Sequence, residues 1–357
     1  MNDEPPKKPP RSALSTDPAG EQGPRNRSGG PRRRELTLRD YVDGIRAGDR
    51  AVLGRALTLI ESNRPEHQDL AQQMLRELLP DTGAAIRVGL TGVPGAGKST
   101  FIETLGTRLT REGHRVAVLA VDPSSGVSGG SILGDKTRMS KLGTDPNAFV
   151  RPSPSGGTLG GVARKTRESM LVCEAAGYDV IVVETVGVGQ SETQVAEMTD
   201  VFCALLLAGA GDELQGIKRG LLELVDVIAV NKADGPDETR AARAARQIEG
   251  ALHIFRGGDE VPVLTCSALQ DVRVAEVWAS IRRLHHARRD SGVIDERRSE
   301  QAVRWMWSLV DEQVSRRLRH DPATRDLADE MEIAVRDGRL PAVEAAVRVI
   351  GRLLGDS

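Results

Sequence analysis

The stretch GVPGAGKST at residues 92–100 restricts the fold of this chain more than any other sequence feature. It fits the pattern G-x-x-x-x-G-K-[ST] at every required position, follows the apolar run AIRVGLTG and precedes a segment with helical spacing. A strand, a glycine-rich turn and a helix in this order present backbone N–H groups to phosphate oxygens. A plain glycine turn is the alternative, but the full match and its context predict a nucleotide-binding α/β domain.

The residue types in this stretch suit a nucleoside triphosphate. Gly92, Gly95 and Gly97 let the backbone curl so that its N–H groups face the phosphates. We expect Lys98 to reach the β- and γ-phosphates and Ser99 to place its hydroxyl on Mg²⁺. The whole loop is predicted to contact the nucleotide: Gly92, Val93, Pro94, Gly95, Ala96, Gly97, Lys98, Ser99 and Thr100.

Further apolar runs predict the rest of the domain. They are RVAVLAVD, DVIVVET, VFCALLL, DVIAVNK and VPVLTCS, with helical stretches between them. Continuous apolar strands that alternate with helices indicate a sheet whose two faces are both covered. The expected fold is therefore α/β, a P-loop NTPase with a mostly parallel sheet flanked by helices.

The remaining segments divide the chain into four predicted parts. Residues 1–34 are rich in Pro and Arg and poor in apolar residues, so we expect a disordered tail. Residues 35–82 are expected to form an N-terminal helical extension and residues 83–285 the nucleotide-binding domain. Residues 286–357 are expected to form a C-terminal helical arm. One face of that arm carries apolar residues at helical spacing: Val303, Trp307, Val310, Val314 and Leu318.

The composition limits where the protein acts. The formal net charge of -2 gives no general attraction to nucleic acid or to a membrane surface. The longest apolar run is too short to span a bilayer, and no apolar segment typical of a signal peptide follows the N-terminus. The three cysteines are far apart and favour a reduced compartment. We therefore expect a cytoplasmic protein with no nucleic-acid or membrane partner.

The segment NKAD at 231–234 predicts which base is bound. Asp234 can accept hydrogen bonds from guanine N1–H and the 2-amino group, two donors that adenine does not present there. Asn231 bonds the base or braces the phosphate loop, and the stem of Lys232 covers the base. A capping turn is the alternative for this segment alone, but beside the phosphate loop it favours GTP over ATP.

A second segment, CSAL at 266–269, ends the last apolar run. The backbone N–H of Ala268 is expected to meet the guanine carbonyl, with Ser267 and Leu269 on either side of it. The predicted ligands are therefore GTP and GDP.

Carboxylates at predicted strand ends suggest a Mg²⁺ site. Asp122 and Glu184 each end a strand, and Asp135 lies in the loop between them. Mg²⁺ takes one or two carboxylates together with water and phosphate oxygens. We expect Ser99 to bind the ion directly, and the three carboxylates to bind it directly or through water. Each carboxylate taken singly is also compatible with a helix cap or a solvated loop.

The stretch ETVGVGQSE at 184–192 reads as a nucleotide switch. The backbone N–H of Gly187 is placed to meet the γ-phosphate, and Gln190 to orient the attacking water, although its offset differs from the common arrangement. The pattern is equally compatible with Gln190 being an ordinary polar residue on the surface. The predicted catalytic residues are Lys98, Glu184, Gly187 and Gln190. Because Val188 stands where many switches carry Gln, we expect slow hydrolysis that a partner accelerates.

The loop at 208–220, AGAGDELQGIKRG, follows another strand. A glycine-rich loop with both charges can read the nucleotide state, and a plain strand-to-helix connection is the alternative. The residues predicted to couple the nucleotide to a partner are Asp212, Glu213, Gln215 and Lys218.

Taken together, GVPGAGKST, VDPSS, GSILGDKTRM, ETVGVGQSE, GAGDELQGIKRG and NKAD resemble the MeaB/ArgK family of P-loop GTPases over residues 36–355. The resemblance implies a GTPase chaperone of adenosylcobalamin-dependent acyl-CoA mutases, chiefly methylmalonyl-CoA mutase. Such a protein gates cofactor loading and protects or reactivates the mutase. By motif, the resemblance assigns phosphate and Mg²⁺ roles to Lys98, Ser99, Asp122, Asp135 and Glu184, base recognition to Asn231, Lys232 and Asp234, and partner coupling to the 208–220 loop, including Lys218. It also implies a homodimer formed through the C-terminal arm.

Other functions remain possible at this point. Related GTPases insert metals into enzymes, but they carry Cys- or His-rich sites, and this sequence has no such cluster apart from His285–His286. An older family label is a kinase or ATPase linked to lysine, arginine and ornithine transport, against which NKAD argues. A binding module with negligible turnover is a third alternative. The Pro/Arg-rich tail at 1–34 departs from the family pattern and leaves localisation and extra contacts open.

Overall fold

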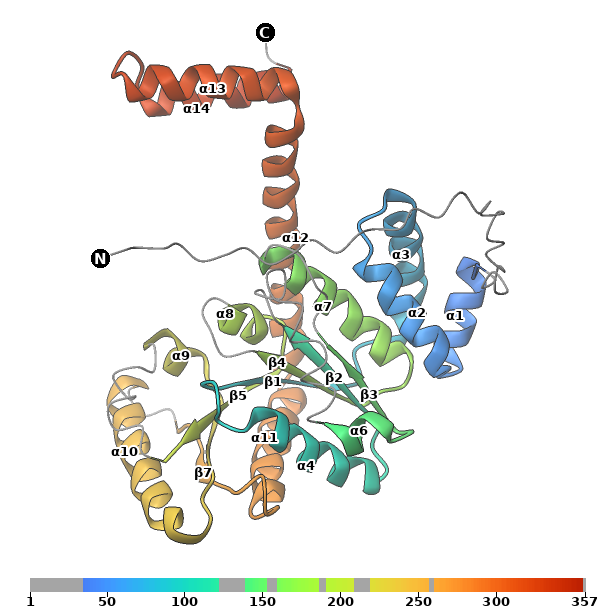
Figure 1. Ribbon diagram of the computed structural model, residues 1–357, viewed down its shortest axis with the longest axis vertical. Helices are drawn as coiled ribbons and strands as arrows, with labels where there is room; N and C mark the ends of the chain where they lie inside the picture. Colours follow the sequence, from blue (N-terminus) through green and yellow to red (C-terminus); the bar gives the residue numbers. More distant parts are fainter. Residues whose placement is uncertain are drawn as a thin grey trace, which may run out of the picture. The chain divides into compact units, whose positions relative to one another are not determined.

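The computed structural model describes residues 35–121, 139–152, 159–185, 191–208, 219–256 and 260–355. Its centre is a parallel sheet with the strand order β3-β2-β4-β1-β5-β6-β7 (Figure 1). The strands are β1 (Ile86–Thr91), β2 (Val116–Val121), β3 (Ala148–Arg151), β4 (Val180–Thr185), β5 (Val201–Leu207), β6 (Val227–Asn231) and β7 (Val263–Thr265). The predicted α/β fold with a parallel sheet is confirmed.

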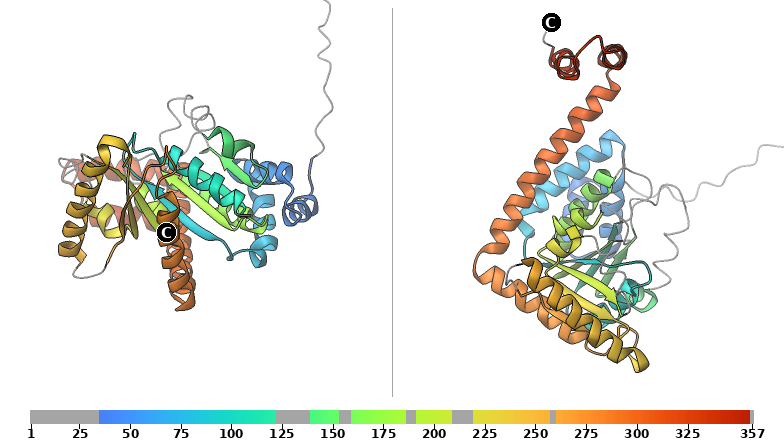
Figure 2. Two further views of the ribbon diagram at one scale, coloured as in Figure 1. Left: turned by 90° about the horizontal axis from the view of Figure 1, so that it is seen from below. Right: turned by 90° about the vertical axis from the view of Figure 1, so that its left-hand side faces the viewer.

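Helices cover both faces of this sheet (Figure 1; Figure 2). One face packs against α4 (Lys98–Arg111), α6 (Ser140–Thr144) and α11 (Val274–Asp290). The other packs against α7 (Leu159–Ala175) and α8 (Ser191–Ala196). Because both faces are buried, the strands carry continuous apolar runs, as the sequence predicted. The remaining helices of the domain are α9 (Arg219–Leu224), η2 (Gly235–Asp237) and α10 (Glu238–Arg256).

The N-terminal extension consists of α1 (Leu38–Arg46), α2 (Arg50–Glu61), α3 (Pro65–Leu78) and the short turn η1 (Leu79–Asp81). Asp49 starts α2, since its carboxylate accepts hydrogen bonds from the backbone N–H groups of Ala51 and Val52. The three helices pack on one another and on α7. An ion pair between Arg151 of β3 and Glu61 of α2 ties the extension to the edge of the sheet.

The chain leaves the sheet through α11 and continues into α12 (Val293–His320), α13 (Pro322–Arg336) and α14 (Ala342–Leu354). Gly292, with φ of 78°, makes the sharp turn between α11 and α12. Helices α13 and α14 pack against each other. Large apolar side chains are exposed along α12 (Val303, Met306, Trp307, Val310, Val314) and on α13 and α14 (Ile333, Val343, Val347, Ile350).

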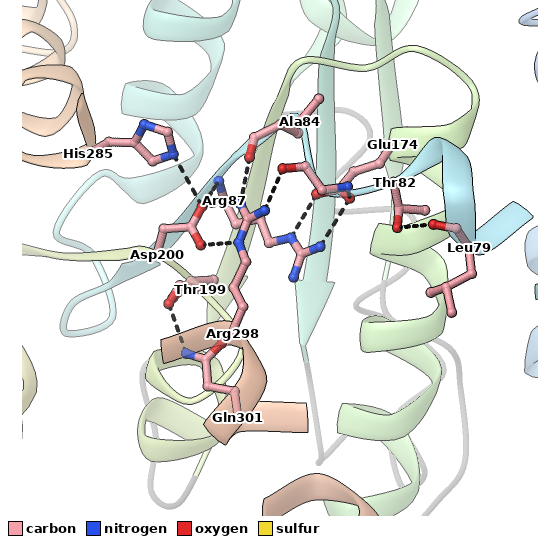
Figure 3. A network of polar contacts seen from close by, with 12 residues as sticks. Leu79, Thr82, Ala84, Arg87, Glu174, Thr199, Asp200, His285, Arg298 and Gln301 are labelled. Atoms are coloured by element: carbon pink, nitrogen blue, oxygen red, sulfur yellow. Dashed lines mark hydrogen bonds and ion pairs between the residues drawn. The ribbon is translucent and has the colours of Figure 1, made fainter. Parts of the chain in front are cut away.

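A buried polar network fixes the start of α12 to the amino-terminal ends of β1 and β5 (Figure 3). The guanidinium of Arg298 donates two hydrogen bonds to the Asp200 carboxylate, at 2.8 and 2.6 Å. It also donates to the carbonyls of Gly83 and Ala85, at 2.6 and 2.7 Å. One side chain therefore holds α12, the segment before β1 and the segment before β5 together.

The same network continues on both sides of Arg298. Arg87 of β1 forms a two-point ion pair with Glu174 of α7, at 2.7 and 3.0 Å, and its backbone N–H donates to Asp200. Burial alone would raise the pKa of Asp200, but the nearby His285 ring, at 3.6 Å, and the hydrogen bonds and charge of Arg298 outweigh it. They hold the pKa of Asp200 well below its usual range, so the carboxylate stays charged.

One edge strand of the sheet was not expected from the sequence, and the helices also bear on whether the chain crosses a membrane. Strand β3 at the sheet edge was not predicted. Within the part of the chain that the structure describes, no helix is both long and apolar enough to cross a membrane.

Candidate functional site

The phosphate-binding stretch forms a tight turn between the end of β1 and the start of α4. Gly92, Gly95 and Gly97 have φ values of 150°, 82° and 89°, which side-chain-bearing residues rarely adopt. A Cβ atom on Gly92 would lie 2.2 Å from the Leu205 carbonyl oxygen, and one on Gly97 would lie 2.6 Å from Nδ2 of Asn231. Both positions therefore need glycine for space as well as for backbone conformation.

Lys98 is the first residue of α4 and its side chain is buried beside the loop. Its Nζ donates to the carbonyl of Gly92 at 2.8 Å and to that of Val93 at 3.4 Å. These two carbonyls hold the ammonium group beside the loop. The backbone N–H groups of the same loop would contact the phosphates. Pro94 and Gly95 lie exposed at the tip of the loop.

Two of the four predicted metal ligands lie together. Ser99, in the first turn of α4, donates from Oγ to Oε1 of Glu184 at 3.4 Å. Glu184 is buried near the carboxyl end of β4, where it is paired in register with Leu90 of β1. A hydroxyl and a carboxylate beside a phosphate loop are hard oxygen donors, which suits Mg²⁺. The other two predicted ligands, Asp122 and Asp135, lie outside the described residues.

A further contact, which the sequence did not reveal, lies next to Glu184. Thr185, one residue after Glu184, donates from Oγ1 to Oγ1 of Thr91 at 2.9 Å, and both side chains are fully buried. This bond links the carboxyl ends of β4 and β1 directly below the loop. No spacing pattern indicates it, because the two threonines are far apart in the sequence.

Asn231 connects the base-recognition segments to the phosphate loop. Its Nδ2 donates to the carbonyl of Ala96 at 2.8 Å, and its Oδ1 accepts from the backbone N–H of Ala268 at 2.9 Å. The sequence left two roles open for Asn231, which are to bond the base or to brace the phosphate loop. The contacts in the structure are those expected for the second role. The N–H of Ala268 was expected to meet the guanine carbonyl, and in this structure it is directed at Asn231.

Neighbouring residues support this arrangement. Burial raises the pKa of the Cys266 thiol to about 12, so the thiol stays protonated and donates to Oδ1 of Asn231 at 3.7 Å. Lys232 has φ of 59° and its side chain is exposed, whereas Asp234 is half-buried at the start of η2. The backbone N–H of Ala233 donates to the Cys266 carbonyl. The NKAD and CSAL segments are thus adjacent at the carboxyl ends of β6 and β7, with Ser267 buried and Leu269 exposed.

The remaining predicted residues lie outside the part of the chain that the structure describes. They are Gly187 and Gln190 of the switch segment, and Asp212, Glu213, Gln215 and Lys218 of the 208–220 loop. Their predicted roles stay predictions.

Both a protein-family model and known proteins match most of this chain. A family model described as methylmalonyl-CoA mutase-associated GTPase MeaB matches residues 53–323. A Caulobacter vibrioides protein described as a putative GTPase is 55% identical over 307 residues, covering 85% of this chain and 94% of its own length.

More distant matches agree with these. The mouse protein described as a mitochondrial methylmalonic aciduria type A homolog is 45% identical over 340 residues, covering 87% of this chain and 82% of its own length. A crystal structure described as that of a LAO/AO transport system kinase has a TM-score of 0.73 and 41% identity. It covers 90% of this chain and 99% of the other.

Proposed function

The chain belongs to the family of methylmalonyl-CoA mutase-associated GTPases, MeaB, and from this membership we propose that it serves an adenosylcobalamin-dependent acyl-CoA mutase as a Mg²⁺-dependent chaperone. As a member of this family the chain is a GTP hydrolase. The observation that carries the proposal furthest is the bridge through Asn231, which joins the phosphate loop to the segments that carry Asp234 and Ala268. Such a bridge supports one site that recognises the triphosphate and the guanine base together.

The proposed chemistry is attack by water on the γ-phosphorus in line with the leaving GDP oxygen. The new bond joins the water oxygen to phosphorus, the bond to the β-phosphate oxygen breaks, and the products are GDP and phosphate. Lys98, already held at the loop by two carbonyls, would place its charge on the β- and γ-phosphates. Gly187 and Gln190 are proposed to contact the γ-phosphate and the attacking water.

Ser99 and Glu184 fit a Mg²⁺ site, because their oxygens lie 3.4 Å apart beside the phosphate loop. We propose that Asp122 and Asp135 complete it, directly or through water. Mg²⁺ bound there would neutralise negative charge that develops on the phosphate oxygens. Ser99 and Glu184 would fix its position relative to Lys98.

Hydrolysis is proposed to be slow in the isolated protein and faster on the mutase. The side chain of Val188 has no hydrogen-bonding group that could orient water. Unassisted GTPases turn over on the order of 10⁻⁴ to 10⁻³ s⁻¹. Residues Asp212, Glu213, Gln215 and Lys218 are proposed to couple the nucleotide state to the mutase, so that GTP hydrolysis gates cofactor loading and reactivation.

The exposed apolar face of α12 supports a homodimer. Val303, Trp307, Val310 and Val314 lie on one side of the helix at intervals of three or four residues, and each is more than 40% exposed. An apolar face of this extent is expected to be covered by a partner. We propose that residues 286–357 form the dimerisation arm, with a tail at 1–34, a helical extension at 35–82 and the GTPase domain at 83–285.

One alternative function has an observation in its favour. The solved structure with a TM-score of 0.73 is described as a transport system kinase. A kinase would transfer the γ-phosphate to a protein or small molecule rather than to water. The NKAD segment argues for guanine, so an ATP-dependent kinase is the less favoured function.

The test is phosphate release from GTP with and without a purified methylmalonyl-CoA mutase. We expect slow release alone and a clear increase when the mutase is added, because the mutase completes the catalytic site. Lys98→Ala is the control, and it should lose GTP binding since it removes the cation proposed to contact the β- and γ-phosphates. If no cobalamin-dependent mutase changes the rate, the chaperone proposal is wrong. If Lys98→Ala keeps its affinity for GTP, the assignment of the phosphate loop is wrong.

A further inference from the structure

The loop Ser267–Arg273, which follows β7, is attached to α4 by two polar contacts. Thr104 donates from Oγ1 to the carbonyl oxygen of Ala268 at 2.7 Å. Arg108, one turn further along α4, donates from Nη2 to Oδ2 of Asp271 at 2.7 Å. Since α4 begins with Lys98, the helix that carries the phosphate loop also holds the loop that carries Ala268.

Apolar packing holds Ala268, which is buried in the core, but not the rest of this loop. The side chain of Leu269 is 81% exposed and that of Val272 is 42% exposed. A cavity of about 370 Å³ lies beside these contacts and is lined by Thr104, Arg108 and Asp271 among others. The two polar contacts therefore hold the exposed part of the loop against α4, while Ala268 packs in the core.

The backbone of this loop is also unfavourable in itself. Asp271 and Arg273 have φ values of 56° and 58°, in the left-handed region. Ser267 and Val272 exchange backbone hydrogen bonds at 2.9 and 3.0 Å, which closes the loop on itself. Residues in such conformations persist when neighbouring contacts fix them. Arg108 supplies one of these contacts directly, since its partner is Asp271.

Ala268 is held on both sides of its backbone. Its N–H donates to Asn231 at 2.9 Å, and its carbonyl accepts from Thr104 at 2.7 Å. Because peptide groups are planar, fixing the carbonyl also fixes the orientation of the following N–H, that of Leu269. Both peptide groups of Ala268 are thus set by contacts from outside the loop.

We propose that Thr104 is a positioning residue for base recognition, and that Arg108 assists it. They keep the Ser267–Arg273 loop at a fixed distance from the phosphate loop, so that base and phosphates are bound in one geometry. This inference rests on the proposed function, because it requires Ala268 to lie at the guanine base. Thr104 lies outside the phosphate-binding stretch 92–100, so its loss should change how long a nucleotide stays bound and leave the chemical step intact.

The test compares two threonines on one helix. Thr104→Val removes the hydroxyl that bonds to Ala268 while keeping the side-chain shape. Thr107→Val makes the same change three residues away, where the hydroxyl is buried and has no hydrogen-bond partner. The measurement is the dissociation rate of the fluorescent analogue mant-GDP by stopped flow, together with single-turnover hydrolysis of GTP.

We expect mant-GDP to leave Thr104→Val about fivefold faster than wild type, the factor that one neutral hydrogen bond provides. Thr107→Val should dissociate at the wild-type rate, and Thr104→Ser should restore it. Arg108→Ala should have a smaller effect, since its ion pair is partly exposed. The rate of single-turnover hydrolysis should stay within twofold of wild type in all four variants, because none of these substitutions removes a group that acts in the chemical step.

The outcomes separate this inference from the proposed function. If wild-type protein does not bind mant-GDP, guanine recognition itself is wrong. If wild type binds and Thr104→Val dissociates no faster than Thr107→Val, only the positioning role is wrong. A Thr104→Val variant that also hydrolyses bound GTP many times more slowly would overturn the inference as well, because the residue would then act on the chemical step.

Discussion

The side chain of Arg298 is expected to contribute more to stability than any exposed charge on α12. It is 13% exposed, and its partner Asp200 is 1% exposed. Arg298→Ala removes two hydrogen bonds to that carboxylate and two to the backbone carbonyls of Gly83 and Ala85. It leaves a buried negative charge and two carbonyls without these donors (Figure 3).

The size of the effect follows from these contacts. Removing one partner of a buried ion pair costs roughly 3–5 kcal/mol of unfolding free energy. Asp200 keeps the backbone N–H of Arg87 at 2.9 Å and the Nε2 atom of His285 at 3.6 Å, so its charge is not wholly isolated. We therefore expect the lower end, about 3 kcal/mol.

Arg304 on the same helix provides the matched control. It pairs with Glu300 at 3.2 Å, but both side chains are more than half exposed. Arg304→Ala should cost about 0.5 kcal/mol or less, because solvent screens an exposed pair at this spacing. Urea unfolding followed by circular dichroism at pH 7 measures both variants. If Arg298→Ala is no less stable than Arg304→Ala, the network does not anchor α12 as described.

Three further predictions concern the loop, the network and the arm. Gly92→Ala should abolish GTP binding in a calorimetric titration, because its Cβ would lie 2.2 Å from the Leu205 carbonyl; normal affinity would contradict the loop geometry. The pKa of Asp200 is lowered in the folded protein, so its contribution to stability is complete above the unfolded pKa of about 4 and is lost as the pH falls below it. Urea midpoints should therefore fall less steeply below about pH 4 in Asp200→Asn than in wild type, and equal slopes would argue against a charged Asp200. Trp307→Asp places a charge on the exposed face of α12 and should shift a dimer toward monomer in light scattering, whereas an unchanged mass would exclude this face from the interface.

Local patterns were sufficient for the fold and for part of the site. The apolar runs predicted β1, β2, β4, β5, β6 and β7, because strands buried on both faces carry continuous apolar residues. The phosphate loop was recognisable because its glycines, Lys98 and Ser99 are neighbours in sequence as well as in space. NKAD and CSAL were recognisable for the same reason.

Contacts between distant residues were not predictable in this way. The bond between Thr91 and Thr185, and that between Thr104 and Ala268, join residues far apart in the chain, with no spacing that indicates a partner. The contact of Asn231 with the phosphate loop became visible only in the structure, where its Nδ2 lies 2.8 Å from the Ala96 carbonyl oxygen. Arg298 is one of many arginines in a charged helix, and nothing in the sequence marks it as buried.

The most direct test of the central claim is an exchange of nucleotide preference at Asp234. Wild-type protein should hydrolyse GTP and not xanthosine triphosphate, because the carboxylate of Asp234 is proposed to accept hydrogen bonds from N1–H and the 2-amino group of guanine. Asp234→Asn replaces an acceptor by a donor, and xanthine carries a carbonyl where guanine carries the amino group. Phosphate release by Asp234→Asn should therefore be faster from xanthosine triphosphate than from GTP. An Asp234→Asn variant that keeps the wild-type preference for GTP would contradict guanine recognition at this site.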